Sequence, residues 1–537
     1  MSSNNIAAKN IEVKQGKLIF ASTISFIVLV VAAGIVFPDQ LYNVGIGTMT
    51  YLTDTFGWIY MAGSFFFVVS MFYLAFSKYG DIKLGADDAK PEFSTFSWIG
   101  MLFSAGMGTV MLYWGVAEPV YHYMEPLSSA GITPQTAAAA EFAMKQSFIH
   151  QGIQAWSAFA VVGLAVGYLL YRKNESGLIS NILIPWGRDK ANGNLGKIVN
   201  LICVFGAIAG ISTSLGQSGL SLGVSFSYLF GTPDAPWVVF LLVGVIALIT
   251  IVCTTTGLEK GIKLLSDYNA YLLIGLIVLV GIMGPTTLMI NVYFDAIGNY
   301  LNDFFQDALM LPTFAAAEEA PWVRGWPIYY YAWAIAWAPF VGPFIARVSK
   351  GRTIREFILG SMILPCIGIF LWVAFFGTIG IQSEPAVLEA AAASSKAATF
   401  IVLEDFPLGH VISFGVVIAL FTCFITSLNS STFTLASMSE DGSENPSNKM
   451  KIIWVIAQSA MALTLMMSSK TGIDLLQSIS LIFALPLMFV LFLCIASTFK
   501  MLRAEFAVPA IDQTSVLVFE PKTASDTNVH KAGADLK

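Results

Sequence analysis

The sequence predicts an all-helical integral membrane protein with about twelve transmembrane helices. Of its 537 residues, 56% are hydrophobic and only 12% are charged, whereas soluble domains are roughly a quarter charged. Apolar runs of about 20 residues, long enough to cross a bilayer, also follow one another along the chain. The predicted spans lie near 18–37, 58–77, 98–117, 148–171, 199–225, 236–256, 270–293, 327–346, 357–381, 409–437, 452–469 and 474–499.

The basic residues predict the orientation of these spans. If the N-terminus is cytoplasmic, all but four of the 28 Lys and Arg residues fall in cytoplasmic segments; the exceptions are Lys145, Arg324, Lys396 and Lys470. Such an excess is the rule for cytoplasmic loops. We therefore expect a multi-pass protein of the cell inner (plasma) membrane, embedded in the lipid bilayer with both termini cytoplasmic. A wrong span count would scramble the alternation, so the split also supports twelve.

Three predicted spans look irregular. Span 3 holds the Gly106-Met107-Gly108 cluster, span 5 is rich in glycine, and span 8 contains Pro339. Interrupted backbone is tolerated at membrane depth only where it is buried in protein or lines a cavity, and paired interruptions in two halves of a chain indicate a transporter's binding site. The alternative is that the glycines only allow close helix packing.

Spans 3 and 8 lie five apart, which suits a five-plus-five inverted-repeat fold with two extra N-terminal helices. The predicted organisation is a cytoplasmic tail (1–17), two leading transmembrane helices (18–97), a first inverted repeat (98–293), an extracytoplasmic connector with an interfacial helix (294–326), a second inverted repeat (327–499) and a cytoplasmic tail (500–537).

Large aromatic residues recur on one side of span 8. Trp326, Tyr330, Trp333 and Trp337 are spaced by four, three and four residues, which places them on one helical face. Trp normally prefers the membrane interface. A cavity lined by ring faces suits a cation without N–H donors, such as a quaternary ammonium, at about 2 kcal/mol per desolvated contact. Ordinary packing of an aromatic stripe is the alternative.

Span 10 is unusually polar. Six of the seven residues from Thr426 to Thr432 carry hydroxyl or amide side chains, which are costly in hydrocarbon unless they bond neighbouring helices or coordinate an ion. Neutral oxygens suit Na⁺; hydrogen bonds between helices are the alternative. Glu118, near the end of span 3, is interpreted as structural or gate-related rather than as a proton carrier. We see no nucleophile, metal-ligand spacing or ATP-binding motif, so we expect no enzyme, no cofactor apart from Na⁺ as a coupling ion, and no nucleic-acid partner. A channel is a further alternative of a different class.

Several stretches resemble the betaine/choline/carnitine transporter family. They are Ser104–Gly108 continuing to Trp114–Pro119, Thr256–Lys263, Ala332–Gly342, Phe344–Arg347 with Gly351–Glu356, and the pair Thr426–Ser427. The resemblance implies an inverted-repeat symporter, commonly a homotrimer, that imports trimethylammonium compounds. In sodium-independent exchangers of the family an arginine stands where this chain has Ala270, so sodium coupling is favoured.

The resemblance also implies the site residues. The substrate-binding residues are expected to be Trp333, Trp337, Trp156, Phe159, Gln151, Ala105, Met107 and Ala334. The Na⁺ ligands are expected to be Ser104, Met107, Cys423, Thr426 and Ser427.

The chain departs from the family pattern at Ala334 and Gln151, where aromatic residues are usual, at Phe159, where Tyr is usual, and at Leu428–Ser430. A box with fewer rings and an added amide is expected to bind a bulky trimethylammonium less tightly. The expected function is Na⁺-coupled import of a betaine-like solute such as glycine betaine, choline, carnitine or dimethylsulfoniopropionate. The alternative is a carrier of a small non-quaternary zwitterion, such as taurine or ectoine, or a sodium-independent exchanger on the same fold.

Overall fold

The structure is a computed structural model. It describes the backbone of residues 3–106, 108–256, 259–314, 316–443, 445–470 and 473–507. It describes their side chains except at 3–14, 103–106, 109, 259–264, 266, 316–317 and 507.

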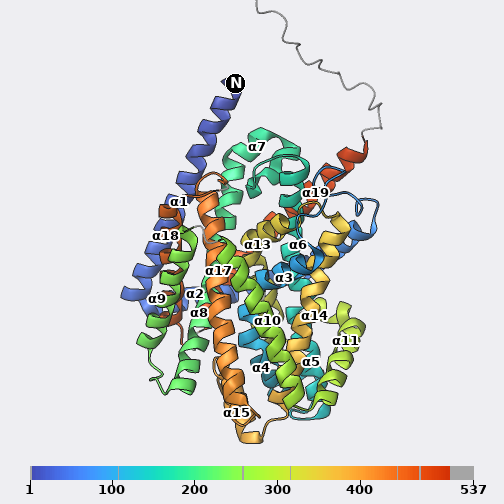
Figure 1. The fold of residues 1–537 in the computed structure, drawn as a ribbon, viewed down its shortest axis with the longest axis vertical. Helices are drawn as coiled ribbons and strands as arrows, with labels where there is room; N and C mark the ends of the chain where they lie inside the picture. The colour runs from blue at the N-terminus through green and yellow to red at the C-terminus, as the bar shows by residue number, and fades with distance from the viewer. Residues whose placement is uncertain are drawn as a thin grey trace, which may run out of the picture.

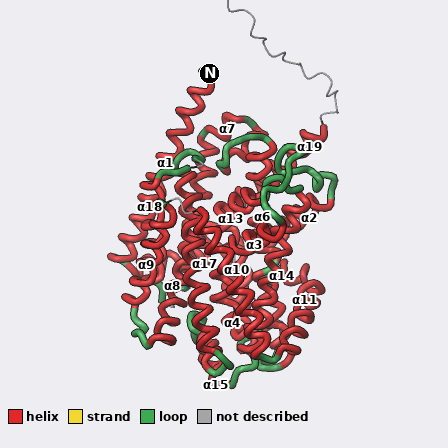
Figure 2. Tube along the Cα trace, viewed as in Figure 1, coloured by secondary structure: helices red, strands yellow, loops and turns green. Residues whose placement is uncertain are grey.

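Helices make up the regular structure of the described residues (Figure 2), apart from one isolated antiparallel bridge between Lys83 and Thr353. In chain order they are α1 (Ser3–Val36), α2 (Pro38–Phe76), α3 (Thr95–Gly106), α4 (Gly108–Met124), η1 (Ser128–Ala130), α5 (Ala137–Gln151), α6 (Ile153–Gly167), η2 (Tyr168–Arg172), η3 (Ile179–Trp186), α7 (Arg188–Asn192), α8 (Asn194–Phe230), α9 (Pro236–Thr255), α10 (Glu259–Met283), α11 (Thr286–Ala308), α12 (Ala316–Val323), η4 (Arg324–Ile328), α13 (Tyr329–Val348), α14 (Ile354–Ile381), α15 (Pro385–Ala393), α16 (Ala398–Glu404), α17 (Gly409–Ser439), α18 (Asn448–Ser468) and α19 (Asp474–Ala507).

Within the described ranges, nine helical segments are long and apolar enough to cross a membrane. A tenth is obtained if α10 and α11, bent by 119° at a short break, count as one span. The two remaining predicted runs coincide with α3 and α4 and with the proline-containing α13. The structure thus supports a multi-pass helical membrane protein, while the full number of twelve stays a prediction. The predicted tail 1–17 is helical from Ser3 onward.

The predicted irregularity of span 3 falls on Met107, which lies outside the described residues; α3 ends at Gly106 before it and α4 begins at Gly108 after it. In span 5, α8 runs without a break from Asn194 to Phe230. In span 8, α13 continues through Pro339, and the irregular part is the preceding π-helical turn η4. A break that the sequence did not suggest separates α5 from α6 at Gly152.

Glycines of α8 serve the alternative role of close packing. A Cβ on Gly206 would collide with Leu487 of α19, and a Cβ on Gly216 would collide with Leu476 of the same helix. A Cβ on Gly210 would lie 2.6 Å from Cδ1 of Trp337. Small residues allow helices in membranes to approach this closely. The prediction of an irregular span 5 was therefore wrong, because its glycines serve close packing in a continuous helix.

Helix α13 lies inside the bundle (Figure 1) and packs against α6, α8 and α19. Helix α4 packs against α5, α14 and α17. Helices α1, α9 and α18 form one flank of the molecule, and α11 and α14 lie on the other. Helices α3, α6 and α8 therefore pack around α13 in the interior.

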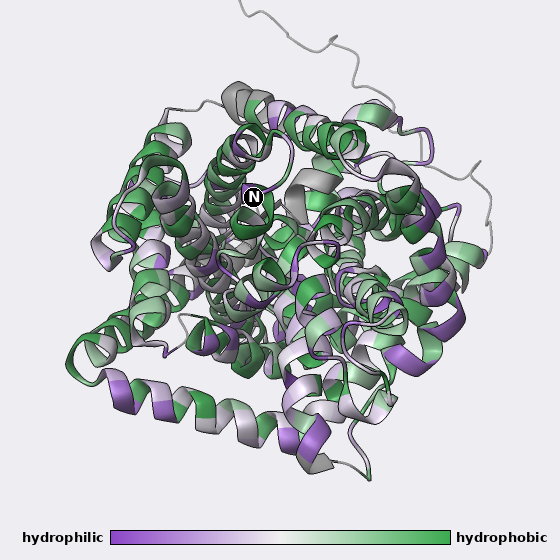
Figure 3. Ribbon diagram, turned by 90° about the horizontal axis from the view of Figure 1, so that it is seen from below, coloured by the Kyte–Doolittle hydropathy of each residue, from purple (hydrophilic) through white to green (hydrophobic). Residues whose placement is uncertain are grey.

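The outer faces of the bundle are apolar as well as its core. Figure 3 shows hydrophobic colouring on peripheral as well as central helices. Large exposed apolar side chains include Leu29 of α1, Trp237 and Leu248 of α9 and Ile274 of α10. Exposed apolar faces of this extent mark contact with membrane or protein, as expected for helices that face lipid.

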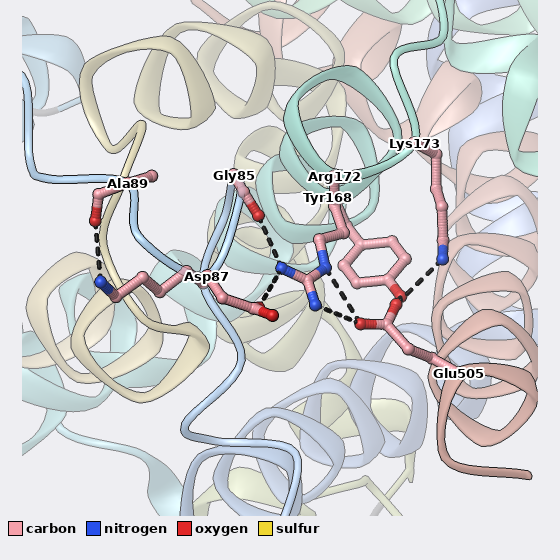
Figure 4. A network of polar contacts seen from close by, with 8 residues as sticks. Gly85, Asp87, Ala89, Tyr168, Arg172, Lys173 and Glu505 are labelled. Atoms are coloured by element: carbon pink, nitrogen blue, oxygen red, sulfur yellow. Dashed lines mark hydrogen bonds and ion pairs between the residues drawn. The ribbon is translucent and has the colours of Figure 1, made fainter. Parts of the chain in front are cut away.

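An ionic network ties the end of α19 to the loop after α2 (Figure 4). Arg172 donates to Oε1 of Glu505 from Nε at 2.9 Å and from Nη2 at 2.7 Å, and it reaches the carbonyl of Gly85 at 2.8 Å and Oδ1 of Asp87 at 2.5 Å. Lys173 and Tyr168 donate to the other oxygen of Glu505. The carboxylate of Glu505 thus holds three segments together.

Candidate functional site

The predicted aromatic face of span 8 is present. Trp326, Tyr330, Trp333 and Trp337 are all buried, and their ring centroids follow one another at 6.5, 6.2 and 6.1 Å. Tyr329 stacks on Trp333 at 5.4 Å. We call the four predicted rings the aromatic column.

The polar edges of the two deep indoles are occupied by α8. Trp337 donates its indole N–H to the carbonyl oxygen of Gly210 at 3.0 Å. Trp333 donates to the same oxygen at 3.3 Å and to Oγ of Ser214 at 3.1 Å. Because these N–H groups are satisfied within the protein, the indoles would meet a ligand through their ring carbons and faces, which suits a cation without N–H donors.

Trp156 and Phe159 lie on α6, the helix that packs along α13. Both are buried, and their rings meet edge to face at 5.4 Å. Ala334, the third predicted position on α13, is also buried. The structure therefore places five of the predicted substrate residues, Trp156, Phe159, Trp333, Ala334 and Trp337, on two adjacent helices.

Gln151 lies at the break between α5 and α6 and faces a different partner. Its amide nitrogen donates to Oε2 of Glu118 at 2.9 Å. This bond fixes the orientation of the amide, and Oε1 of Gln151 is then buried without a hydrogen-bond partner among the described residues. A buried acceptor in this condition favours a ligand that brings an N–H or O–H donor.

Glu118 is the centre of a fully buried polar cluster. Its Oε1 lies 2.6 Å from Nδ1 of His150, and its Oε2 accepts from the hydroxyl of Tyr330 at 2.5 Å as well as from Gln151. His122, one turn further along α4, places Nε2 3.7 Å from Oε1. Sequence reasoning treated Glu118 as structural and did not connect it with the histidines. The signal that could have done so is an ionisable residue inside an apolar run, which is rare without function.

The predicted Na⁺ site lies partly outside the described residues. This holds for Met107 and for the side chains of Ser104 and Ala105. A Cβ on Gly108 would collide with Cys423, so the start of α4 lies directly against α17. Asn269 of α10 donates to Sγ of Cys423 at 2.7 Å and accepts from Thr422 at 2.9 Å.

Two hydroxyl side chains, those of Thr426 and Ser427, follow Cys423 along α17. Thr426 donates to the carbonyl oxygens of Thr422 and Cys423, both at 3.0 Å, which leaves the lone pairs of its hydroxyl free to accept. Within the described part of the chain, the hydroxyl of Ser427 makes no hydrogen bond. Neutral hard oxygens of this kind fit Na⁺, and they are the residues that would hold it.

The second half of the polar segment has the other predicted role. Ser431 donates to Oε1 of Gln458 at 2.6 Å, and Nε2 of Gln458 donates to Thr432 at 3.0 Å. Gln458 belongs to α18. Hydrogen bonds between helices therefore account for Ser431 and Thr432.

A bundle of apolar helices in which the polar helix α17 packs against α4, beside buried aromatic residues, is consistent with a membrane transporter. The model of the betaine/carnitine/choline family transporters matches residues 18–507. The chain belongs to this family, and it is a transporter rather than an enzyme.

Several relatives are similar over nearly the whole chain. The glycine betaine transporter OpuD of Bacillus subtilis is 40% identical over 490 residues, which are 90% of this chain and 95% of the relative. The ectoine/hydroxyectoine transporter of Virgibacillus pantothenticus is 37% identical over 88% of this chain and 94% of its own. The high-affinity choline transport protein of Escherichia coli K12 is 34% identical over 92% of this chain and 73% of its own.

Proposed function

We propose that this protein is a Na⁺-coupled importer of a betaine-like onium solute, with glycine betaine as the first solute to test. The observation that carries the proposal is the aromatic column. Trp333 and Trp337 are buried in the bundle and direct their N–H groups to α8, so their π faces are suited to a methylated ammonium. The 40% identity with a glycine betaine transporter supports the same solute class.

Sodium coupling is proposed from the oxygens of α17. Thr426 and Ser427 follow Cys423, which lies against Gly108 at the start of α4, and the resemblance places the ion between these two helices. Ala270 adjoins Asn269, whose side chain bonds Cys423 and Thr422. The position where sodium-independent relatives carry an arginine thus adjoins the proposed ion site, and alanine there leaves the positive charge to be supplied by Na⁺.

Assembly and orientation complete the proposal. We expect a homotrimer, on the resemblance to the family, with an inverted-repeat fold and with both termini cytoplasmic in the plasma membrane. Nearly all of the basic residues lie on the proposed cytoplasmic side, which supports the orientation. Native mass spectrometry of the purified protein in detergent gives the subunit number.

The alternative solute class has its own support. The buried Oε1 of Gln151 has no partner among the described residues, and a relative of 37% identity is an ectoine/hydroxyectoine transporter. A zwitterion with an N–H donor would satisfy that oxygen, whereas a trimethylammonium group would not.

Reconstituted vesicles test the proposal. Purified protein in liposomes should accumulate labelled glycine betaine when an inward Na⁺ gradient is imposed, and not with K⁺ in its place. Accumulation of ectoine but not glycine betaine would support the alternative, and equal uptake in Na⁺ and K⁺ would overturn sodium coupling.

A further inference from the structure

The Glu118 cluster is a buried acid without a fixed cation. Glu118, His122 and His150 are each 0% exposed. No Lys or Arg among the described residues forms an ion pair with Glu118. Asp307 of α11, which acts electrostatically on His150, is paired with Lys145 of α5 at 3.0 Å, and Lys145 also pairs with Asp303 at 2.7 Å. The other titratable side chains near Glu118 among the described residues are the phenols of Tyr329, Tyr330 and Tyr331 of α13, with Tyr113 of α4 beside Tyr329 and Tyr330.

Glu118 and His150 share a proton in a hydrogen bond. The 2.6 Å between its Oε1 and Nδ1 of His150 requires a hydrogen on one of the two atoms. If His150 is neutral and supplies that hydrogen to an ionised Glu118, the cluster carries one uncompensated negative charge. Burying such a charge in apolar protein is expensive. One additional proton on the carboxyl or on a histidine cancels it.

The cluster has room for that proton. Nε2 of His150 and Nδ1 of His122 have no hydrogen-bond partner among the described residues. His122 also stands 3.7 Å from Oε1 of Glu118. Two basic ring nitrogens in a dry interior thus remain available to hold or relay a proton, a role that intramembrane Glu and His residues fill in transporters.

Tyr330 is a member of the aromatic column and also contacts the Glu118 cluster. Its hydroxyl donates to Oε2 of Glu118 at 2.5 Å, and its ring centroid lies 6.2 Å from that of Trp333. A solute that displaces the ring therefore changes a hydrogen bond to the carboxyl. If solute binding changes the proton affinity of the carboxyl by a given factor, linkage requires that proton binding changes the affinity for solute by the same factor.

We propose that Glu118, His150 and His122 form a proton-binding site coupled, through Tyr330, to solute binding at the aromatic column. The proton comes from water on the side from which solute enters and is released on the other side, so no bond other than O–H or N–H is made or broken. The inference adds a second coupling ion to the Na⁺ proposed above, and it rests on the proposed solute transport. It also revises the interpretation of Glu118 as purely structural.

A metal ion fits this cluster less well. Two ligand atoms of a tetrahedral Zn²⁺ with bonds of about 2.0–2.1 Å lie roughly 3.3 Å apart. The observed 2.6 Å between Oε1 of Glu118 and Nδ1 of His150 is the separation of a hydrogen bond. The pair is therefore built around a proton.

Calorimetry of glycine betaine binding to the purified full-length protein measures the proposed coupling. Titrations are run in NaCl, in two buffers of different protonation enthalpy, near the ordinary titration range of histidine. The difference in apparent enthalpy between buffers gives the protons exchanged. We expect uptake of about one proton per solute, and its loss in Glu118→Gln and in His150→Gln. His410→Gln is the matched control because His410 is exposed and bonds Tyr228; it should behave as the wild type.

The outcomes separate the two proposals. Binding with the same enthalpy in both buffers, or proton uptake that persists in both cluster variants, would overturn the proton site and leave solute binding intact. If no glycine betaine binds, the solute proposal fails, and the proton site is tested by infrared difference spectra of the solute-free protein between high and low pH. A carboxyl C=O band or an imidazolium ring band that appears at low pH in the wild type and is missing in Glu118→Gln or His150→Gln supports it, and difference spectra that are identical in the wild type and both cluster variants overturn it. Size-exclusion profiles matching the wild type establish that each variant is folded.

Discussion

Trp337 and Gly210 contact each other through an indole N–H that donates to a carbonyl oxygen at 3.0 Å, and the contact exists only because residue 210 has no side chain. A Cβ at that position would lie 2.6 Å from Cδ1 of Trp337 and 3.0 Å from the backbone of Ala336. The position of the deep end of the aromatic column is therefore set by α8.

Replacing Gly210 should disturb the column. We expect Gly210→Ala to move Trp337 and to weaken glycine betaine binding by about tenfold, which corresponds to roughly 1.4 kcal/mol. Gly244→Ala in α9 is the matched control, because no atom lies within 4 Å of a Cβ built there. Equilibrium binding to purified protein measures both, and equal affinity in the two variants would show that α8 does not position the column.

Removing a ring of the column should cost affinity directly. We expect Trp333→Ala and Trp337→Ala each to weaken binding by about 1–2 kcal/mol, the range of a cation–π contact. Trp237→Ala, on the exposed face of α9, should bind as the wild type does. Wild-type affinity in both column variants would remove the aromatic column from the binding site.

The hydroxyls of Thr426 and Ser427 should determine the response to sodium. We expect Thr426→Ala and Ser427→Ala to raise the Na⁺ concentration for half-maximal solute binding by roughly tenfold, with the loss of a bond to a charged species worth about 1.5–3 kcal/mol at most. Thr434→Ala is the control, because among the described residues its hydroxyl bonds only the carbonyl of Ser430 in its own helix. A Na⁺ response that is the same in all three variants would argue against this site.

Gln151 should set the choice between solute classes. We expect Gln151→Trp to raise the affinity for glycine betaine and to lower the affinity for ectoine, because a ring replaces an amide whose Oε1 has no partner among the described residues. The ratio of the two dissociation constants is the measurement. A ratio unchanged from wild type would show that this residue does not select the solute.

The network at the end of α19 should stabilise the protein. Glu505→Gln removes the charge that Arg172 and Lys173 share, and we expect a loss of roughly 1–3 kcal/mol of stability, the range for hydrogen bonds to charged groups. Thermal unfolding in detergent measures it, with Glu389→Gln as the control, because Glu389 makes no hydrogen bond or ion pair within the described residues. Equal melting temperatures for the two variants would show that the network contributes nothing to stability.

The features that the sequence predicted correctly are those that depend on local periodicity. The spacing of Trp326, Tyr330, Trp333 and Trp337 defines a helical face whatever the neighbouring helices are. This face appears in the structure as predicted. The predicted irregularity of span 3 falls on Met107, which lies outside the described residues.

The features that could not be predicted depend on which helices become neighbours. The glycines of α8 were interpreted as a possible break because their partners, Leu487 and Leu476, lie far along the chain. Pro339 stays within a helix that is enclosed by others, where neighbours stabilise an interrupted ladder. Gln151 was expected beside the solute, and only the approach of α4 to α5 reveals its bond to Glu118.

Equilibrium binding across a panel of glycine betaine, choline, carnitine, dimethylsulfoniopropionate, taurine and ectoine, in NaCl and in KCl, tests the central claim most directly. The proposed function predicts tight binding of a methylated onium in NaCl, weak binding of it in KCl, and loss of the NaCl signal in Trp337→Ala. Binding that is indifferent to Na⁺, or that is confined to taurine or ectoine, would contradict the claim of a sodium-coupled onium importer.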